Sequence, residues 1–191
     1  MEMTIRQILW MVCGAVMSCN VWALEVAGVK LADTVQVGNS SLQLNGAGIR
    51  TKFFFKIYVS ALYLPQKQNL PDTIIADEHE HRIALHMLHE LNSKKLYGAF
   101  SEAIEVNHTH AELVALETQM KQMAQIFDEV KEVKPGDVIT LDYLPASGTQ
   151  ISVNGTARGT IAGAPFNRAL LRIWLGSKPV QDDLKKAMLG G

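Results

Sequence analysis

The sequence contains little cysteine and no excess of either charge. Its 191 residues include two cysteines, 18 Lys and Arg, and 19 Asp and Glu, which gives a formal net charge of −1. A near-neutral chain has no electrostatic footprint for nucleic acid, and no basic run suggests a lipid surface. Low-complexity segments and internal repeats are also missing, so we expect one globular domain with a packed core.

The first 23 residues differ from the rest of the chain. Arg6 precedes the apolar run Ile8–Met17, and the segment closes on Val21-Trp22-Ala23, with small residues at the two positions that a signal peptidase inspects. This pattern predicts a secretory signal peptide over residues 1–23, which is too short and too weakly flanked for a transmembrane anchor.

An alternative is a lipoprotein signal in Val16–Cys19, "VMSC", with Cys19 acylated. Ser18 is small enough for the position before such a cysteine, whereas Met17 is bulky where a small residue is usual. Whether Cys19 is lipidated stays open at this point.

Cleavage after residue 23 would remove both cysteines, Cys13 and Cys19. We therefore expect a periplasmic or secreted domain over residues 24–191, without a disulfide and without stable insertion into a membrane. Its stability must then come from packing.

Residues 24–65 show the alternation that is typical of strands, with a turn at Gly38-Asn39. The segment Thr51–Leu64 predicts one long strand with a dry face and a mixed face. The dry face is expected to hold Phe53, Phe55, Ile57, Val59, Ala61 and Tyr63, and the mixed face Lys52, Phe54, Lys56, Tyr58, Ser60 and Leu62.

Helical spacing dominates the middle of the chain. Residues 93–107 predict a helix capped by Asn92 or Ser93, and a stripe at steps of three and four predicts a longer helix from Thr109 to Val130, with a capping box of Thr109 and Glu112. Three short strands follow, with a hairpin turn at Asn154-Gly155, and two helices close the chain. Strands, helices, strands and helices in this order predict an α+β fold.

Six histidines (His79, His81, His86, His89, His108 and His110) raise the question of a metal. No cysteine accompanies them and the neighbouring carboxylates fit a solvated loop, so surface histidines and no metal site are expected. Gly46 and Gly48 lack the third glycine of a dinucleotide fingerprint and precede a strand, so we expect no cofactor there, only a bulge or a close backbone approach.

Arg50 is the most informative polar residue, because it stands beside two glycines and before an aromatic strand. A surface arginine is the default, but an arginine next to an apolar pocket can hold a carboxylate or an enolate with paired N–H donors. Tyr58, on the mixed face, can supply a second donor.

The stretches "LNGAGIRTKFFFKIYVSALYLP" and "NGTARGTIAGAPFNRALLRIWLGSKPVQDDLKKAMLG" resemble the chalcone isomerase-like family, in its secreted bacterial branch. The resemblance implies an open-faced β-sandwich, in which a large antiparallel sheet is covered by a helical layer and a ligand cleft lies between them. Some members close a chalcone to a flavanone, and others bind fatty acids without catalysis through an arginine and a tyrosine.

The resemblance places Arg50 at the family arginine and Tyr58 where the isomerase has a catalytic threonine. Ile173 and Trp174 stand where the isomerase has a substrate-contacting threonine and methionine, and Tyr97 lies near the position of a helix tyrosine. With hydroxyls lost around the expected oxyanion, we expect a non-catalytic protein that binds a small apolar acid such as a fatty acid. Its ligand-binding residues would be Arg50, Tyr58, Ile173 and Trp174. An intramolecular lyase and a structural or partner-binding envelope protein remain the alternatives.

Overall fold

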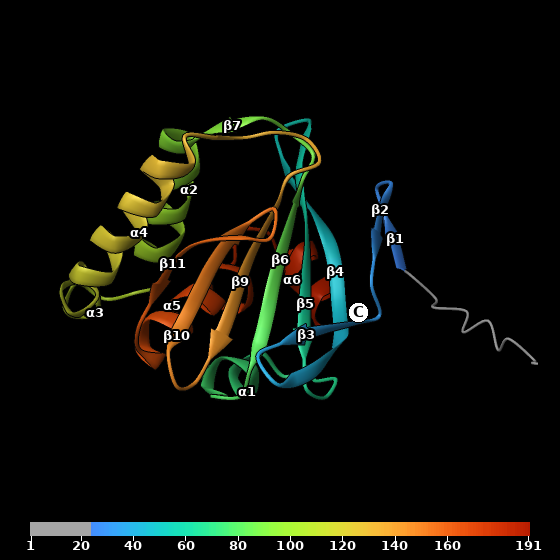
Figure 1. Ribbon diagram of the computed structural model, residues 1–191, viewed down its shortest axis with the longest axis horizontal. Coiled ribbons are helices and arrows are strands. Elements are labelled where there is room, and N and C mark those ends of the chain that lie inside the picture. The colour runs from blue at the N-terminus through green and yellow to red at the C-terminus, as the bar shows by residue number, and fades with distance from the viewer. Residues whose placement is uncertain (1–23) are drawn as a thin grey trace, which may run out of the picture.

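The computed structural model describes residues 24–191, and the expected signal peptide, residues 1–23, lies outside the described residues. A curved antiparallel sheet of seven strands forms the centre, in the order β11-β10-β9-β6-β5-β4-β3 (Figure 1). Its strands are β3 (Thr34–Val37), β4 (Ser40–Lys52), β5 (Phe55–Leu64), β6 (His81–Met87), β9 (Val138–Leu144), β10 (Gly148–Val153) and β11 (Thr156–Ile161).

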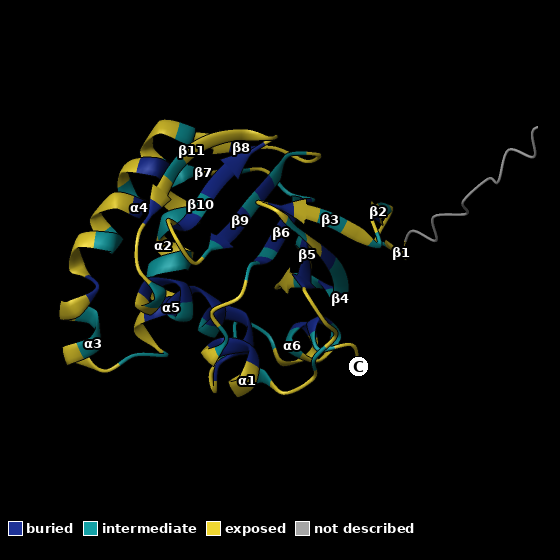
Figure 2. Cartoon of the chain, turned by 60° about the horizontal axis from the view of Figure 1, so that its bottom comes forward, coloured by how far each residue is buried: buried dark blue, intermediate teal, exposed yellow. Residues whose placement is uncertain are grey.

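Helices pack on one face of this sheet and around its edges. They are α1 (Pro71–Ala76), α2 (Ser93–Glu105), α3 (His110–Ala115), α4 (Glu117–Val130), α5 (Ala164–Leu175) and α6 (Asp182–Met188). Figure 2 shows α5 almost wholly buried under the sheet, whereas α3 and α4 keep an exposed outer side. The predicted α+β open-faced sandwich is confirmed.

Two small antiparallel pairs lie outside the main sheet. β1 (Leu24–Val26) and β2 (Val29–Leu31) form a hairpin, and β7 (Leu91–Asn92) pairs with β8 (Glu132–Val133). The predicted turn at Asn154-Gly155 is confirmed, because both residues have the positive φ that this kind of hairpin needs (51° and 76°). No helix within residues 24–191 is long and apolar enough to span a bilayer.

The core is divided between the two faces of the sheet. The larger cluster, between the sheet and the helices, contains Leu62, Ile83, Phe166, Leu171 and Trp174 among its buried members. A smaller cluster on the other face is built on Leu31, Val37, Leu42, Val59 and Tyr63.

This division corrects the expected assignment of faces on β5. Val59, Ala61 and Tyr63 do share one buried face, but they enter the smaller cluster, whereas Leu62 from the expected mixed face enters the larger one. Both faces of β5 are therefore covered, which alternation alone predicts for one face only.

The aromatic start of the expected strand is also different. β5 begins at Phe55, and Phe53 and Phe54 form the two-residue turn that joins it to β4. All three phenylalanines are exposed, so Phe53 and Phe55 are not dry-face residues. No glycine or asparagine marks this turn, which is why the sequence pattern continued across it.

The long helix expected from Thr109 is two helices, since α3 ends at Ala115 and α4 begins at Glu117. Buried Leu116 at the junction keeps the apolar stripe in phase, so the break leaves no trace in the spacing. The capping box is confirmed: Thr109 N donates to Glu112 Oε2 over 2.8 Å, and Glu112 N donates to Thr109 Oγ1 over 3.4 Å. The segment between β5 and β6 contains the short helix α1.

Candidate ligand-binding site

A cavity of about 790 Å³ lies between the sheet and the helical layer. Its wall is mostly apolar: the sheet contributes Leu85, Ile139, Leu141, Ile151 and Val153, and the helices contribute Leu96, Phe100, Met123, Ile126, Phe127, Leu170, Ile173 and Trp174. A volume in the range of roughly 300–1,000 Å³ with few polar groups is typical of a small-molecule site.

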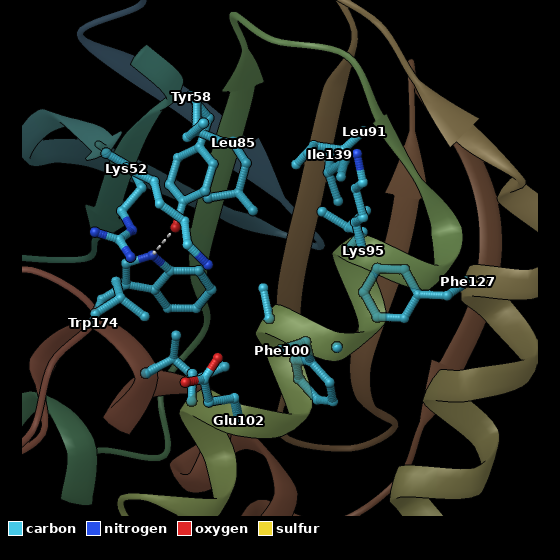
Figure 3. A pocket seen from close by; sticks show the side chains of 18 of the residues that line it. Lys52, Tyr58, Leu85, Leu91, Lys95, Phe100, Glu102, Phe127, Ile139 and Trp174 are labelled. Atoms are coloured by element: carbon cyan, nitrogen blue, oxygen red, sulfur yellow. Dashed lines mark hydrogen bonds between the residues drawn. The ribbon is translucent and has the colours of Figure 1, made fainter. Parts of the chain in front are cut away.

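The mouth of the cavity is found from the lining residues that are exposed. Lys52, Phe53 and Phe55 come from the β4–β5 turn and the strand ends beside it, and Lys95 and Glu102 come from α2. The cavity therefore opens between this turn and α2. In Figure 3, Lys52, Tyr58 and Trp174 lie on the left of the space and Phe127 on its right, with Phe100 and Glu102 below.

Two polar residues of the wall, Arg50 and Tyr58, are direct partners in the β4–β5 pair. Directly opposed residues of an antiparallel pair point to the same face of the sheet, so both side chains leave it on the side of the helices and the cavity. The regular pairing of two neighbouring strands is what brings them together.

The Arg50 guanidinium is held from one side by neutral groups. Its Nη1 donates to the Thr51 carbonyl over 3.0 Å and to Gln181 Oε1 over 3.3 Å. Gln181 is fixed in turn, because its Oε1 accepts from Thr51 N and its Nε2 donates to the Ile49 carbonyl. Within residues 24–191, Arg50 has no carboxylate partner, which leaves its positive charge and several N–H donors for a ligand.

The Tyr58 hydroxyl accepts a hydrogen bond from Trp174 Nε1 over 3.1 Å (Figure 3). Indole N–H is a donor only, so the phenol oxygen is the acceptor and its own hydrogen remains free to donate. Burial raises the pKa of Tyr58, and the Trp174 hydrogen bond and the Arg50 charge lower it to a smaller extent. The phenol is therefore neutral at pH 7 and keeps the hydrogen that a ligand oxygen can accept.

All four residues expected to bind a ligand, Arg50, Tyr58, Ile173 and Trp174, line this one cavity. Their part in binding stays a prediction. Tyr97 is not part of the wall: its ring packs against Phe100 and Phe127, at centroid distances of 6.1 and 5.9 Å.

Sequence reasoning missed the other cations of the site. Lys52, Lys95 and Lys178 line the cavity with Arg50, against one carboxylate, Glu102. They come from the β4–β5 turn, from α2 and from the segment after α5. Their meeting depends on how helices pack on the sheet, which no local pattern encodes.

The histidines do not form a cluster. No group of three or more His, Cys, Asp or Glu that could hold a metal ion is found in the described part of the chain. His81 corrects the expectation of surface histidines, because it is buried, with Nδ1 3.0 Å from the His79 carbonyl and Nε2 3.0 Å from the Asn167 side-chain amide. Burial lowers the pKa of His81, so it is a neutral core residue.

The glycines before Arg50 mark a bulge and a close approach, as predicted. The β4–β5 register shifts between Leu44 and Gly46, and a Cβ on Gly46 would lie 2.2 Å from the Ala187 carbonyl oxygen of α6. Because Gly46 and Gly48 have no side chains, α6 packs directly on β4. This packing brings Gln181, the residue just before α6, to Arg50.

Comparison with known proteins agrees with this architecture. A fatty-acid binding protein of Arabidopsis thaliana has a similar fold, with a TM-score of 0.64 and 15% sequence identity over 85% of this chain and 92% of that one. At this identity the likeness shows the fold alone. No protein with a curated description matches the sequence. The sequence model of the chalcone isomerase-like family matches residues 23–190, which is nearly all of the described domain. The chain therefore belongs to the chalcone isomerase-like family.

Proposed function

We propose that the protein binds an amphipathic acid, such as a fatty acid, in the cavity between sheet and helices. The observation that carries the proposal is an apolar cavity of about 790 Å³ in which Arg50 has no carboxylate partner in the described chain. A buried or half-buried cation without a counter-ion is costly, and a ligand carboxylate would supply the missing charge.

In this proposal the carboxylate lies between Arg50 and Tyr58. Arg50 donates charge-assisted hydrogen bonds from the N–H groups that Thr51 and Gln181 leave free, and the Tyr58 hydroxyl donates its hydrogen. The alkyl part extends along the wall formed by Leu85, Ile139 and Phe127. The fatty-acid binding protein of the same fold supports this ligand class.

The proposal is for binding without catalysis. Stabilisation of an enolate or phenolate requires several donors aimed at the developing charge. The two positions where the isomerase contacts its substrate are Ile173, which has no donor, and Trp174, whose single N–H is already given to Tyr58. The lysine donors of the wall, Lys52, Lys95 and Lys178, are exposed side chains.

We also propose that the protein works outside the cytoplasm, after cleavage behind Ala23. The support is the pattern of Arg6, the apolar run and the small residues before Leu24. Mass determination of the N-terminus of the protein recovered from a periplasmic extract tests this, with Leu24 expected as the first residue. An acylated Cys19 or an intact residue 1 would contradict it.

The binding proposal is tested with a fluorescent long-chain fatty acid and the fatty alcohol of equal length. Arg50→Gln is expected to weaken acid binding about tenfold or more, since a hydrogen-bonded charge contributes about 1.5–3 kcal/mol, and to leave alcohol binding nearly unchanged. Mass spectrometry of extracts from the native protein should show a carboxylic acid that is depleted in the variant.

Arg158→Gln is the matched control, because Arg158 is exposed on β11 and does not line the cavity. Equal acid affinity of native protein and Arg50→Gln would refute the role of Arg50. Saturable cyclisation of a chalcone, followed by absorbance and lost in Arg50→Gln, would replace the binding function by an isomerase.

A further inference from the structure

The turn between β4 and β5 is the most apolar exposed feature of the described chain. Phe53, Phe54 and Phe55 are 83%, 98% and 57% exposed, and they are consecutive. Three neighbouring aromatic side chains in water lose the free energy that burial would give each of them. Isolated exposed apolar residues need no explanation, but a cluster of this kind indicates a surface that is covered by something else.

The turn projects from one end of the molecule. In Figure 1 the β4–β5 turn lies at the top, at the same end as β7, beyond the edge of the other sheet strands. Phe55 packs on His89 with ring centroids 5.1 Å apart, so the base of the turn is anchored. Phe54 at the tip is free to contact another surface.

The backbone makes the choice of residue at Phe53 informative. Phe53 has φ 56°, a left-handed conformation that glycine adopts easily and a bulky residue does not. A two-residue hairpin turn of this kind normally has glycine at that place. Phe53 therefore places an aromatic side chain at a position where the backbone conformation favours glycine.

The two lysines that flank the phenylalanines indicate the kind of surface that the turn contacts. Lys52 and Lys56 stand on either side of the three phenylalanines, both exposed and neither in an ion pair within residues 24–191. The phenylalanines separate them, so they form no basic run in the sequence. An aromatic tip between two lysines is complementary to a bilayer interface with anionic headgroups, where the rings enter the acyl boundary and the ammonium groups stay at the headgroups.

The size of the tip argues against a stable protein interface. Three phenylalanines can bury about 500 Å² together, whereas a specific protein interface needs about 800 Å² from each partner. A tip of this size is sufficient for reversible attachment to a membrane. Phe53, Phe55 and Lys52 also line the mouth of the cavity, so such attachment would bring the cavity opening to the lipid surface.

We propose that the Lys52–Lys56 turn docks the protein on anionic membranes, with Phe53 and Phe54 in the bilayer interface. The mouth of the cavity then faces the membrane, and a lipid-derived ligand can pass between bilayer and cavity without crossing water. This inference goes beyond ligand binding, because docking does not depend on which ligand the cavity holds.

Flotation with large vesicles tests the proposal. The protein, with its N-terminus determined by mass, is mixed with vesicles of equimolar phosphatidylethanolamine and phosphatidylglycerol. Phe54→Ser is expected to lower the vesicle partition coefficient about tenfold or more, and Lys52→Gln and Lys56→Gln about fivefold each. Binding should be weaker on pure phosphatidylcholine and at about 0.5 M salt.

Two variants separate docking from folding. Phe53→Gly removes a ring but suits the turn, so it should keep or raise the melting temperature while it lowers vesicle binding. Leu70→Ser is the matched control, since Leu70 is 58% exposed and does not line the cavity. Its vesicle binding should equal that of the native protein.

Equal partition of native protein and Phe54→Ser would overturn the proposal, as would the absence of vesicle binding by the native protein. A dimer in size-exclusion chromatography that Phe54→Ser dissolves would assign the tip to a second copy and also overturn it. Fatty-acid affinity of Phe54→Ser in detergent-free buffer is measured separately, so a failure of docking is distinguishable from a failure of ligand binding.

Discussion

Arg50 and Tyr58 occupy directly opposite positions on β4 and β5, and both line the same cavity. Arg50 supplies a charge that no carboxylate of residues 24–191 neutralises, and Tyr58 supplies a hydroxyl hydrogen that no neighbour there accepts. We propose that this cation and this neutral phenol, side by side at an apolar cavity, bind one ligand carboxylate. The strand register fixes their geometry before any ligand arrives.

Removal of the Tyr58 hydroxyl should weaken ligand binding, and it should also lower the stability of the fold by about 1–3 kcal/mol because the buried Trp174 N–H loses its acceptor. Tyr58→Phe loses one hydrogen bond to the ligand, worth about 1 kcal/mol, so affinity for the fluorescent fatty acid should fall about fivefold. Tyr63→Phe is the matched control, because Tyr63 packs in the smaller cluster on the other face of the sheet. A loss of affinity in Tyr63→Phe as large as in Tyr58→Phe would mean that the effect is not local to the site.

Glu112 makes the free energy of unfolding depend on pH in the acidic range. Hydrogen bonds from Thr109 and then from Arg172 lower the pKa of Glu112 from 4.5 to about 2. A carboxyl with a lowered folded-state pKa stabilises the fold above pH 4.5, and this contribution is lost as the pH falls towards 2. Titration of the Glu112 carboxyl by NMR should give a pKa of about 2.

Glu112→Gln tests the same linkage by unfolding. Glutamine can keep the capping box with Thr109 but carries no charge for Arg172, which lies 3.1 Å away. The urea midpoint of the variant should be lower than that of the native protein at pH 6 and approach it at pH 2. A constant difference across this range would show that the charge of Glu112 is not the cause.

Arg82 and Asp142 form an ion pair across β6 and β9 with two hydrogen bonds, of 2.5 and 2.6 Å. Asp142 is buried, so Asp142→Asn leaves a poorly solvated guanidinium and should cost about 3 kcal/mol of unfolding free energy. Glu117→Gln, which breaks the exposed pair with Lys121, should change the unfolding free energy much less, because water screens this pair. Equal costs of the two substitutions in urea denaturation would contradict the difference in burial.

Local rules were reliable where one residue decides the conformation. The Thr109–Glu112 capping box, the Asn154-Gly155 turn and the close approach at Gly46 each depend on the identity of one or two residues, which can be recognised in the sequence. The turn at Phe53 shows the limit of such rules, because its left-handed residue is not a glycine and the strand pattern passes through it. If that turn is used for contact with a membrane, a local rule is broken for function, as is expected at functional sites.

The candidate site could be predicted only in part. Arg50 was predicted from its place beside two glycines and before an aromatic strand, and Tyr58 from the mixed face of that strand. The family resemblance pointed to both, and also to Ile173 and Trp174. The turn at Phe53-Phe54 that pairs Arg50 with Tyr58 was not predicted. Lys95, Lys178 and Gln181 could not be found in this way. They reach the cavity or Arg50 from α2 and from the segment between α5 and α6, so their position depends on tertiary packing.

The packing of α6 on β4 gives the last prediction. A Cβ on Gly46 would lie 2.2 Å from Ala187 O and 2.8 Å from Met188 O, which are backbone atoms that cannot turn away. Gly46→Ala must therefore push the end of α6 outward and strain the bonds that Asn45 Nδ2 makes to Met188 O and Gln68 O. It should cost about 2 kcal/mol or more in urea denaturation and increase amide exchange in α6.

Gly98→Ala is the control on exposed α2, where an added Cβ meets nothing within 4 Å, and it should stabilise the protein by about 1 kcal/mol. Because α6 follows Gln181, Gly46→Ala should also weaken fatty-acid binding through Arg50, and an unchanged affinity would show that α6 does not position the guanidinium.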